Sequence, residues 1–156
     1  MRNNLRIFLI AGALLLSGTV AGASLAFAED DTPTPDNAAS PDYMKVKAEV
    51  DAGDYQPALA ELMTLEKANP NDPDILNLIG FSLRKTGHPD QALDYYTRAL
   101  AQNPEHLDAN EYLGELYLEM KQPEKAMERL AVLQKACGDC EEYTELKEKI
   151  AQQAAN

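Results

Sequence analysis

Two cysteines, separated by two residues in the motif Cys137-Gly138-Asp139-Cys140, are the residues best suited to chemistry. A Cys-x-x-Cys pair beside a helix N-terminus can have a lowered thiol pKa and exchange disulfides. The same pair in an oxidising compartment forms a structural disulfide. We favour the structural disulfide, because thiol exchangers carry this motif within a βαβ unit and no segment here alternates like a strand. Thiol–disulfide exchange through Cys137 and Cys140 remains the alternative function.

Other catalytic or cofactor-binding chemistry lacks the residues it needs. Covalent haem requires a histidine after the second cysteine, where Glu141 stands, and no further ligands are spaced for zinc. His88 and His106 each stand alone, without a metal-binding partner at helical spacing, and we interpret them as surface polar residues. No nucleophile elbow, phosphate-binding loop or dinucleotide fingerprint occurs. We therefore predict a protein that is not an enzyme and has no cofactor or metal.

Length and charge narrow the class of partner. The chain has 156 residues, 45% of them hydrophobic, which is enough for one domain with a core. Its 26 acidic and 14 basic side chains give a net charge of −12, which disfavours binding to nucleic acid and to anionic membranes. The composition favours a neutral or basic protein partner.

The N-terminal 28 residues have the order of a secretory signal peptide. Arg2 and Arg6 are followed by an apolar stretch over 7–25, and then by the small-x-small cleavage pattern Ala26-Phe27-Ala28. We expect cleavage after Ala28 and a periplasmic or secreted protein; an uncleaved membrane anchor is the alternative. Residues 29–41, acidic and rich in proline, are expected to form a disordered tether, with the folded domain over 42–156.

The rest of the chain repeats with a spacing of 34 residues. Helical apolar periodicity runs throughout, with short connections that require antiparallel neighbouring helices. The repeats fall at about 39–72, 73–106 and 107–140. The matching positions are Gly53/Gly87, Ala58/Ala92/Ala126, Leu62/Tyr96/Leu130, Pro70/Pro104 and Gly80/Gly114. Gly80 and Gly114, mid-helix, predict close approach of a neighbouring helix. The facing small residues would be Ala58, Ala92 and Ala126, with Leu62, Tyr96 and Leu130 filling the space beside them.

This pattern resembles the tetratricopeptide repeat family, and the middle repeat matches it best. The matching residues there are Leu76, Ile79, Gly80, Leu83, Gly87, Ala92, Tyr96, Ala99 and Pro104. The outer repeats depart from the pattern; in the third, for example, Lys121 stands in place of the turn glycine. The resemblance implies an all-α, right-handed superhelix of three helix-turn-helix repeats that binds a protein or peptide.

A C-terminal helix over 141–154 is expected to cap the stack, as repeat arrays require. Its apolar stripe consists of Tyr143, Leu146 and Ile150, and Asp139 and Glu142 are placed as a capping box.

The resemblance also implies a concave groove lined by the first helix of each repeat. The positions carried over are Tyr43, Lys47, Asn77, Phe81, Arg84, Lys85, Asp108, Glu111, Glu115 and Glu119. Phe81 and Tyr43 are the expected apolar anchors, and the three glutamates form a stripe that would steer a basic partner segment. The family's clamp for a C-terminal carboxylate needs basic residues where these glutamates stand. The leading hypothesis is an exported, non-enzymatic scaffold in a bacterial envelope assembly.

Overall fold

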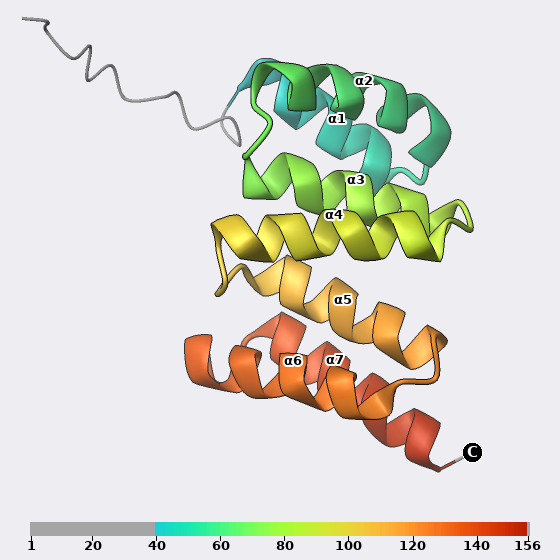
Figure 1. Ribbon diagram of the computed structural model, residues 1–156, viewed down its shortest axis with the longest axis vertical. Coiled ribbons are helices and arrows are strands. Elements are labelled where there is room, and N and C mark those ends of the chain that lie inside the picture. The colour runs from blue at the N-terminus through green and yellow to red at the C-terminus, as the bar shows by residue number, and fades with distance from the viewer. Residues whose placement is uncertain (1–39, 156) are drawn as a thin grey trace, which may run out of the picture. The chain divides into compact units, whose positions relative to one another are not determined.

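The computed structural model describes residues 40–155, which form seven α-helices and no strand (Figure 1). The helices are α1 (Pro41–Asp51), α2 (Tyr55–Ala68), α3 (Pro73–Lys85), α4 (Pro89–Gln102), α5 (Leu107–Glu119), α6 (Pro123–Ala136) and α7 (Glu141–Ala154). The predicted all-α fold is confirmed. The predicted signal peptide (1–28) and residues 29–39 of the predicted tether lie outside the described residues. Within residues 40–155, no helix has the length and apolar character needed to cross a membrane.

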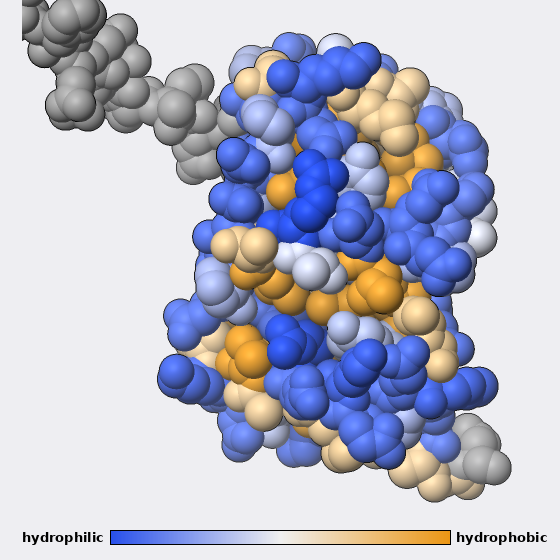
Figure 2. Space-filling view, in the orientation of Figure 1, coloured by the Kyte–Doolittle hydropathy of each residue, from blue (hydrophilic) through white to orange (hydrophobic). Residues whose placement is uncertain are grey.

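The helices form three antiparallel hairpins that stack one after another, α1–α2, α3–α4 and α5–α6 (Figure 1). The second helices begin at Tyr55, Pro89 and Pro123, which reproduces the 34-residue spacing of the sequence. Helix α7 packs against both α5 and α6. On the face in Figure 2, apolar side chains gather in patches, most of them at the level of α4 and α5, within a largely hydrophilic surface.

Local signals define most helix ends. Ser40 caps α1 by accepting a hydrogen bond from the Tyr43 backbone N–H at 3.1 Å, and Pro41 occupies the first turn. Helix α1 therefore begins one residue before the predicted start at position 42. Gly53 and Gly87 follow first helices with φ of 88° and 83°, the left-handed conformation that ends a helix.

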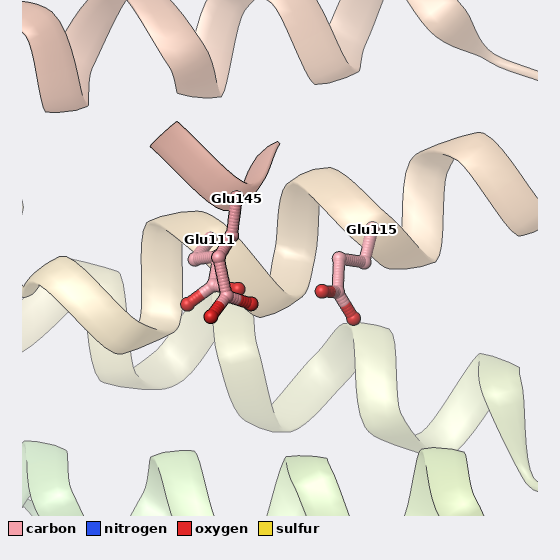
Figure 3. A group of neighbouring side chains, drawn as sticks. All are labelled: Glu111, Glu115 and Glu145. Carbon is pink, nitrogen blue, oxygen red and sulfur yellow. The ribbon is translucent and has the colours of Figure 1, made fainter. Parts of the chain in front are cut away.

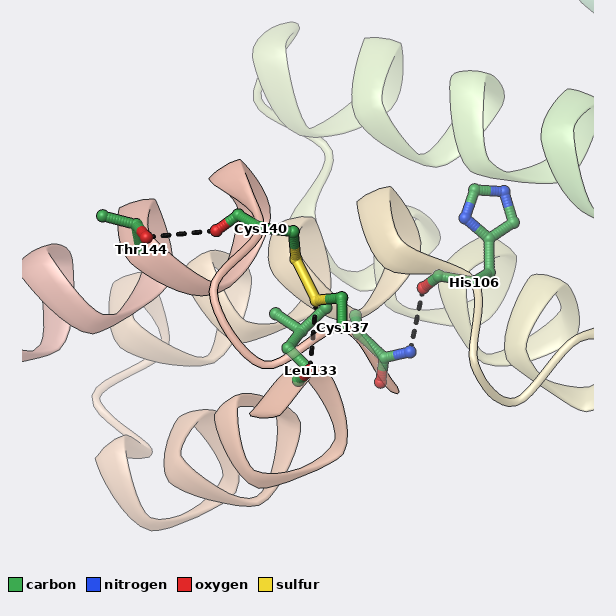
Figure 4. Close-up of a disulfide and its surroundings, with 6 residues drawn as sticks. His106, Leu133, Cys137, Cys140 and Thr144 are labelled. Carbon is green, nitrogen blue, oxygen red and sulfur yellow. Dashed lines mark hydrogen bonds between the residues drawn. A yellow bond between two sulfur atoms is a disulfide. The ribbon is translucent and has the colours of Figure 1, made fainter. Parts of the chain in front are cut away.

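The predicted capping box at the start of α7 is wrong. Cys140, not Asp139, is the residue before the first turn, and its side chain makes no capping hydrogen bond. In the structure, Cys140 is joined by a disulfide to Cys137, the residue that follows α6 (Figure 4). The Asp139 backbone N–H donates to the Cys137 carbonyl at 3.0 Å, so the short loop turns back on itself. The bridge encloses two residues and joins the ends of α6 and α7.

Gly80 and Gly114 lie where a large side chain from another helix approaches closely, as predicted for Tyr96 but not for Leu146. A Cβ atom on Gly80 would lie 2.9 Å from ring carbons of Tyr96, and one on Gly114 would lie 2.5 Å from a methyl carbon of Leu146. Tyr96 and Leu146 are both fully buried. Each glycine therefore makes room for a bulky core side chain, one from α4 and the other from α7.

Lys121 provides a test of the turn geometry after α5. It has a φ of 60°, the left-handed conformation that the first two repeats assign to glycine. This conformation costs a side chain with a Cβ about 1 kcal/mol, and Lys121 is exposed. We expect Lys121→Gly to raise the free energy of unfolding by about 0.5–1 kcal/mol in urea titrations. The reverse change, Gly87→Lys, should lower the free energy of unfolding. If both variants were as stable as the parent, the assignment of this turn would be contradicted.

Candidate functional site: a groove over the first helices

A groove runs over α1, α3, α5 and α7, and it consists of two hollows. The larger hollow, of about 530 Å³, lies among α3, α5 and α7. The smaller, of about 260 Å³, lies among α1, the start of α2, α3 and α5. Phe81 and Tyr112 line both hollows, so the two meet at this pair of rings.

Aromatic rings form the floor where the hollows meet. The ring centroids of Phe81 and Tyr112 are 4.6 Å apart, and Tyr55 contacts Phe81 edge-on at 5.9 Å. The Lys85 ammonium lies 5.0 Å from the Phe81 ring centroid, in cation–π contact. Tyr43 is buried and lines the smaller hollow. The floor where the hollows meet therefore consists largely of aromatic side chains.

Most of the predicted groove residues do line these hollows. They are Tyr43, Lys47, Phe81, Arg84, Lys85, Asp108, Glu111, Glu115 and Glu119. Asn77 lines neither; only 2% of its surface is exposed, and the next residue, Leu78, lines the smaller hollow in its place. The geometry brings the predicted residues together, and their role in binding remains a prediction.

The predicted glutamate stripe is paired with cations of the same chain. The Arg84 side chain is only 4% exposed, and its guanidinium lies 2.5 Å from Glu115 and 2.8 Å from Glu119. Lys149 of α7 contacts Glu115 as well, and lies 3.3 Å from Glu111 and 3.0 Å from Glu145. The stripe therefore differs from the free, steering set of charges that the sequence predicts. Arg84, expected to face a partner, instead binds α5.

Burial and pairing move the pKa values of these glutamates in opposite directions. Burial, and then the neighbouring charge of Glu115, raise the pKa of Glu111 to about 8. Burial alone would also raise the pKa of Glu115, but Arg84 and Lys149 outweigh it and hold that pKa below its ordinary value. Glu115 is therefore the ionised centre of the network, and Glu111 is the glutamate whose charged form is disfavoured by burial and by Glu115.

Glu111, Glu115 and Glu145 approach closely enough to be considered as a metal site. Their carboxylate oxygens lie within 4.8 Å of one another, and Figure 3 shows Glu111 and Glu145 converging from α5 and α7. The Lys149 ammonium, however, already pairs with all three, so it supplies the positive charge that the cluster requires. We therefore assign the cluster to the packing of α7.

Sequence reasoning missed Tyr112, Glu145 and Lys149, although two signals were present. Tyr112 lies four residues after Asp108, on the same helical face. Glu145 and Lys149 lie 34 residues after Glu111 and Glu115, so the repeat spacing continues into α7. The capping helix thus occupies the place of the first helix in a fourth repeat.

His106 is not the surface residue that we predicted. It is 9% exposed, and its Nδ1 caps α5 by accepting from the Ala109 backbone N–H at 3.3 Å. Because Nδ1 accepts, Nε2 carries the proton and donates to Asp74 at 3.0 Å. His106 therefore joins the start of α5 to the start of α3, whereas His88 is exposed as predicted.

Comparisons with known proteins agree with this architecture. A family model described as tetratricopeptide repeat matches residues 83–150, a segment that runs from the end of α3 into α7. A search of curated protein sequences finds no significant match.

Solved structures of tetratricopeptide repeat proteins superpose well. The Yersinia enterocolitica type III secretion chaperone SycD, in complex with a peptide of the translocator YopD, gives a TM-score of 0.62 at 17% identity, over 73% of this chain and 87% of that one. The first repeat domain of Spaghetti (RPAP3), bound to the HSP90 peptide SRMEEVD, gives a TM-score of 0.64 at 18% identity, over 72% of this chain and 90% of that one. YrrB, described as having an unusual peptide-binding site, gives a TM-score of 0.61 at 27% identity, over 69% of this chain and 55% of that one. The described helices therefore have a tetratricopeptide repeat fold.

The raised pKa of Glu111 predicts a loss of stability with rising pH. Between about pH 4.5 and 8 the unfolded chain ionises this carboxyl while the folded chain keeps its proton, so folding becomes less favourable. Glu111→Gln should remove this loss and be more stable than the parent at pH 8, by about 1 kcal/mol, with little difference at pH 4. Urea unfolding at both pH values tests this, with Glu128→Gln on α6 as the control. The same pH dependence in Glu111→Gln and the parent would contradict it.

Proposed function

We propose that this chain is an exported, non-enzymatic scaffold that binds a segment of a partner protein in the groove over α1, α3, α5 and α7. One observation carries this proposal: the two hollows meet at Phe81 and Tyr112, so that one continuous groove with an aromatic floor crosses the stack. Aromatic side chains bury much apolar area with few rotatable bonds, and they dominate the energetics of interfaces.

The similar structures support a peptide as the occupant. Two of them were solved with peptides, one from YopD and one from HSP90. In this chain, the cations Arg84 and Lys149 are already paired with glutamates, so we do not propose capture of a C-terminal carboxylate. The net charge of −12 favours instead a partner segment that carries basic residues.

Export is the second part of the proposal, and it rests on the sequence. Residues 1–28 have the signal-peptide order, with cleavage expected after Ala28, and a disulfide between Cys137 and Cys140 would persist in an oxidising compartment. A periplasmic or secreted location and a role in a bacterial envelope assembly fit these features. The alternative, thiol–disulfide exchange, has only the Cys137 and Cys140 motif in its favour.

Phe81 is the residue on which to test groove binding. A displayed library of random peptides is selected against the full chain, and the dissociation constant of the best synthetic peptide is measured. Phe81→Ala should weaken binding by at least about tenfold, mainly through faster dissociation, because it removes buried contact area.

Asp94→Asn on α4 is the matched control, and it should bind as the parent does. Arg98, on the same helix, is unsuitable as a control because it pairs with Glu66 and stacks on Tyr95. Helix content and urea unfolding of each variant separate lost binding from lost folding. Weakening by Asp94→Asn but not by Phe81→Ala would place the binding site on the outer face.

Processing of the N-terminus tests export. Expressed in a bacterium with a periplasm, the chain should appear in the periplasmic fraction with Glu29 as its first residue, as intact mass and N-terminal sequencing would report. Both cysteines should resist alkylation until a reductant is added. Full-length chain retained in the membrane fraction would favour the anchored alternative.

A further inference from the structure

The smaller hollow combines aromatic walls with acidic groups. Its lining residues are Tyr43, Lys47, Val50, Asp51, Tyr55, Leu78, Phe81, Asp108 and Tyr112. Four of these are aromatic, and they come from α1, α2, α3 and α5. The face of an aromatic ring carries negative electrostatic potential, so several rings around one space attract a cation.

One charge in this hollow is left uncompensated. Lys47 and Asp51 neutralise each other across one turn of α1, with Nζ 2.8 Å from the carboxylate. Asp108, in the first turn of α5, has no hydrogen-bonding or ion-pairing partner for its carboxylate among residues 40–155. The carboxylate of Asp108 is therefore available to a positively charged ligand.

The tyrosines report the negative field of the hollow. Burial, and then the charge of Asp108, raise the pKa of Tyr112. Burial raises the pKa of Tyr43 as well, with contributions from Asp74, Asp72 and Asp108. Acidic groups from α3 and α5 thus act on the same space, and a cation entering it would be stabilised by all of them.

We propose that this hollow is a subsite for a lysine or arginine side chain of the partner segment, held against the aromatic rings with Asp108 as its counter-ion. The inference rests on the proposed groove function and adds the chemistry of one residue of the partner. Only part of the cation need be desolvated, because the ring faces and Asp108 take the place of water.

The larger hollow offers no equivalent site, and this fixes where the basic side chain goes. Its glutamates are engaged by Arg84 and Lys149. Lys85, at the end of α3, has no acidic partner among residues 40–155 and lies over the Phe81 ring. A cationic side chain is therefore repelled on the Lys85 side of Phe81 and attracted on the Asp108 side, which orients the segment along the groove.

The test uses two small probes that are closely similar in size and shape and differ in charge. N-acetyl-arginine amide and its neutral isostere, N-acetyl-citrulline amide, are titrated into the ¹⁵N-labelled full chain at low salt, and backbone amide shifts are followed. We expect saturable shifts at Tyr43, Phe81, Asp108 and Tyr112 with the arginine probe, and at least about tenfold weaker binding of the citrulline probe. Equal affinity for the two probes, or shifts confined to the Glu119 and Glu145 end, would overturn the proposal.

Asp108→Asn keeps the size of the side chain and removes its charge. It should weaken binding of the arginine probe about tenfold without changing binding of the citrulline probe. Asp94→Asn, an exposed change on α4, should alter the binding of neither probe. Unchanged binding of the arginine probe by Asp108→Asn would overturn the proposal.

Peptides selected for the groove distinguish failure of the cation subsite from failure of the groove function. If they need Phe81 but contain no basic residue and ignore Asp108→Asn, the groove function stands and the cation subsite fails.

Discussion

The ion network centred on Glu115 is the interaction on which the groove depends. Glu115 of α5 lies between the guanidinium of Arg84 on α3 and the ammonium of Lys149 on α7. A carboxylate in a largely buried position needs such partners, because a buried charge left unpaired costs about 3–5 kcal/mol. The three helices must therefore keep the spacing that brings these groups together. The wall and floor of the larger hollow follow from that spacing.

The same network determines the electrostatic character of the groove. Because the glutamates of α5 are paired with Arg84 and Lys149, they are less available to a cation of a partner than the carboxylate of Asp108 is. Within residues 40–155, Asp108 on one side of the Phe81–Tyr112 contact and Lys85 on the other have no ion-pair partner. Charges of opposite sign on the two sides of an aromatic centre favour one direction of a bound segment.

Helix α7 both closes the core and completes the groove. Its inner face places Leu146 against Gly114, where a Cβ atom would clash, and its Lys149 reaches back to α5. The disulfide between Cys137 and Cys140 ties the start of α7 to the end of α6, so the cap is held covalently as well as by packing. A terminal repeat usually needs a polar-backed helix to cover its apolar side, and here that helix also supplies the cation of the ion network.

Local spacing in the sequence was sufficient to predict the helices within residues 40–155, the 34-residue repeat, and the turns at Gly53 and Gly87. Helical periodicity and left-handed turn residues act over a few positions, so they can be recognised without the fold. Most of the groove residues followed from the repeat spacing too. The tertiary structure alone decided which charges meet, because Arg84 and Lys149 are distant from Glu115 in sequence and reach it only through the packing of three helices. It also decided the buried, capping role of His106, which a lone histidine in a turn does not reveal, since burial depends on the neighbouring hairpin.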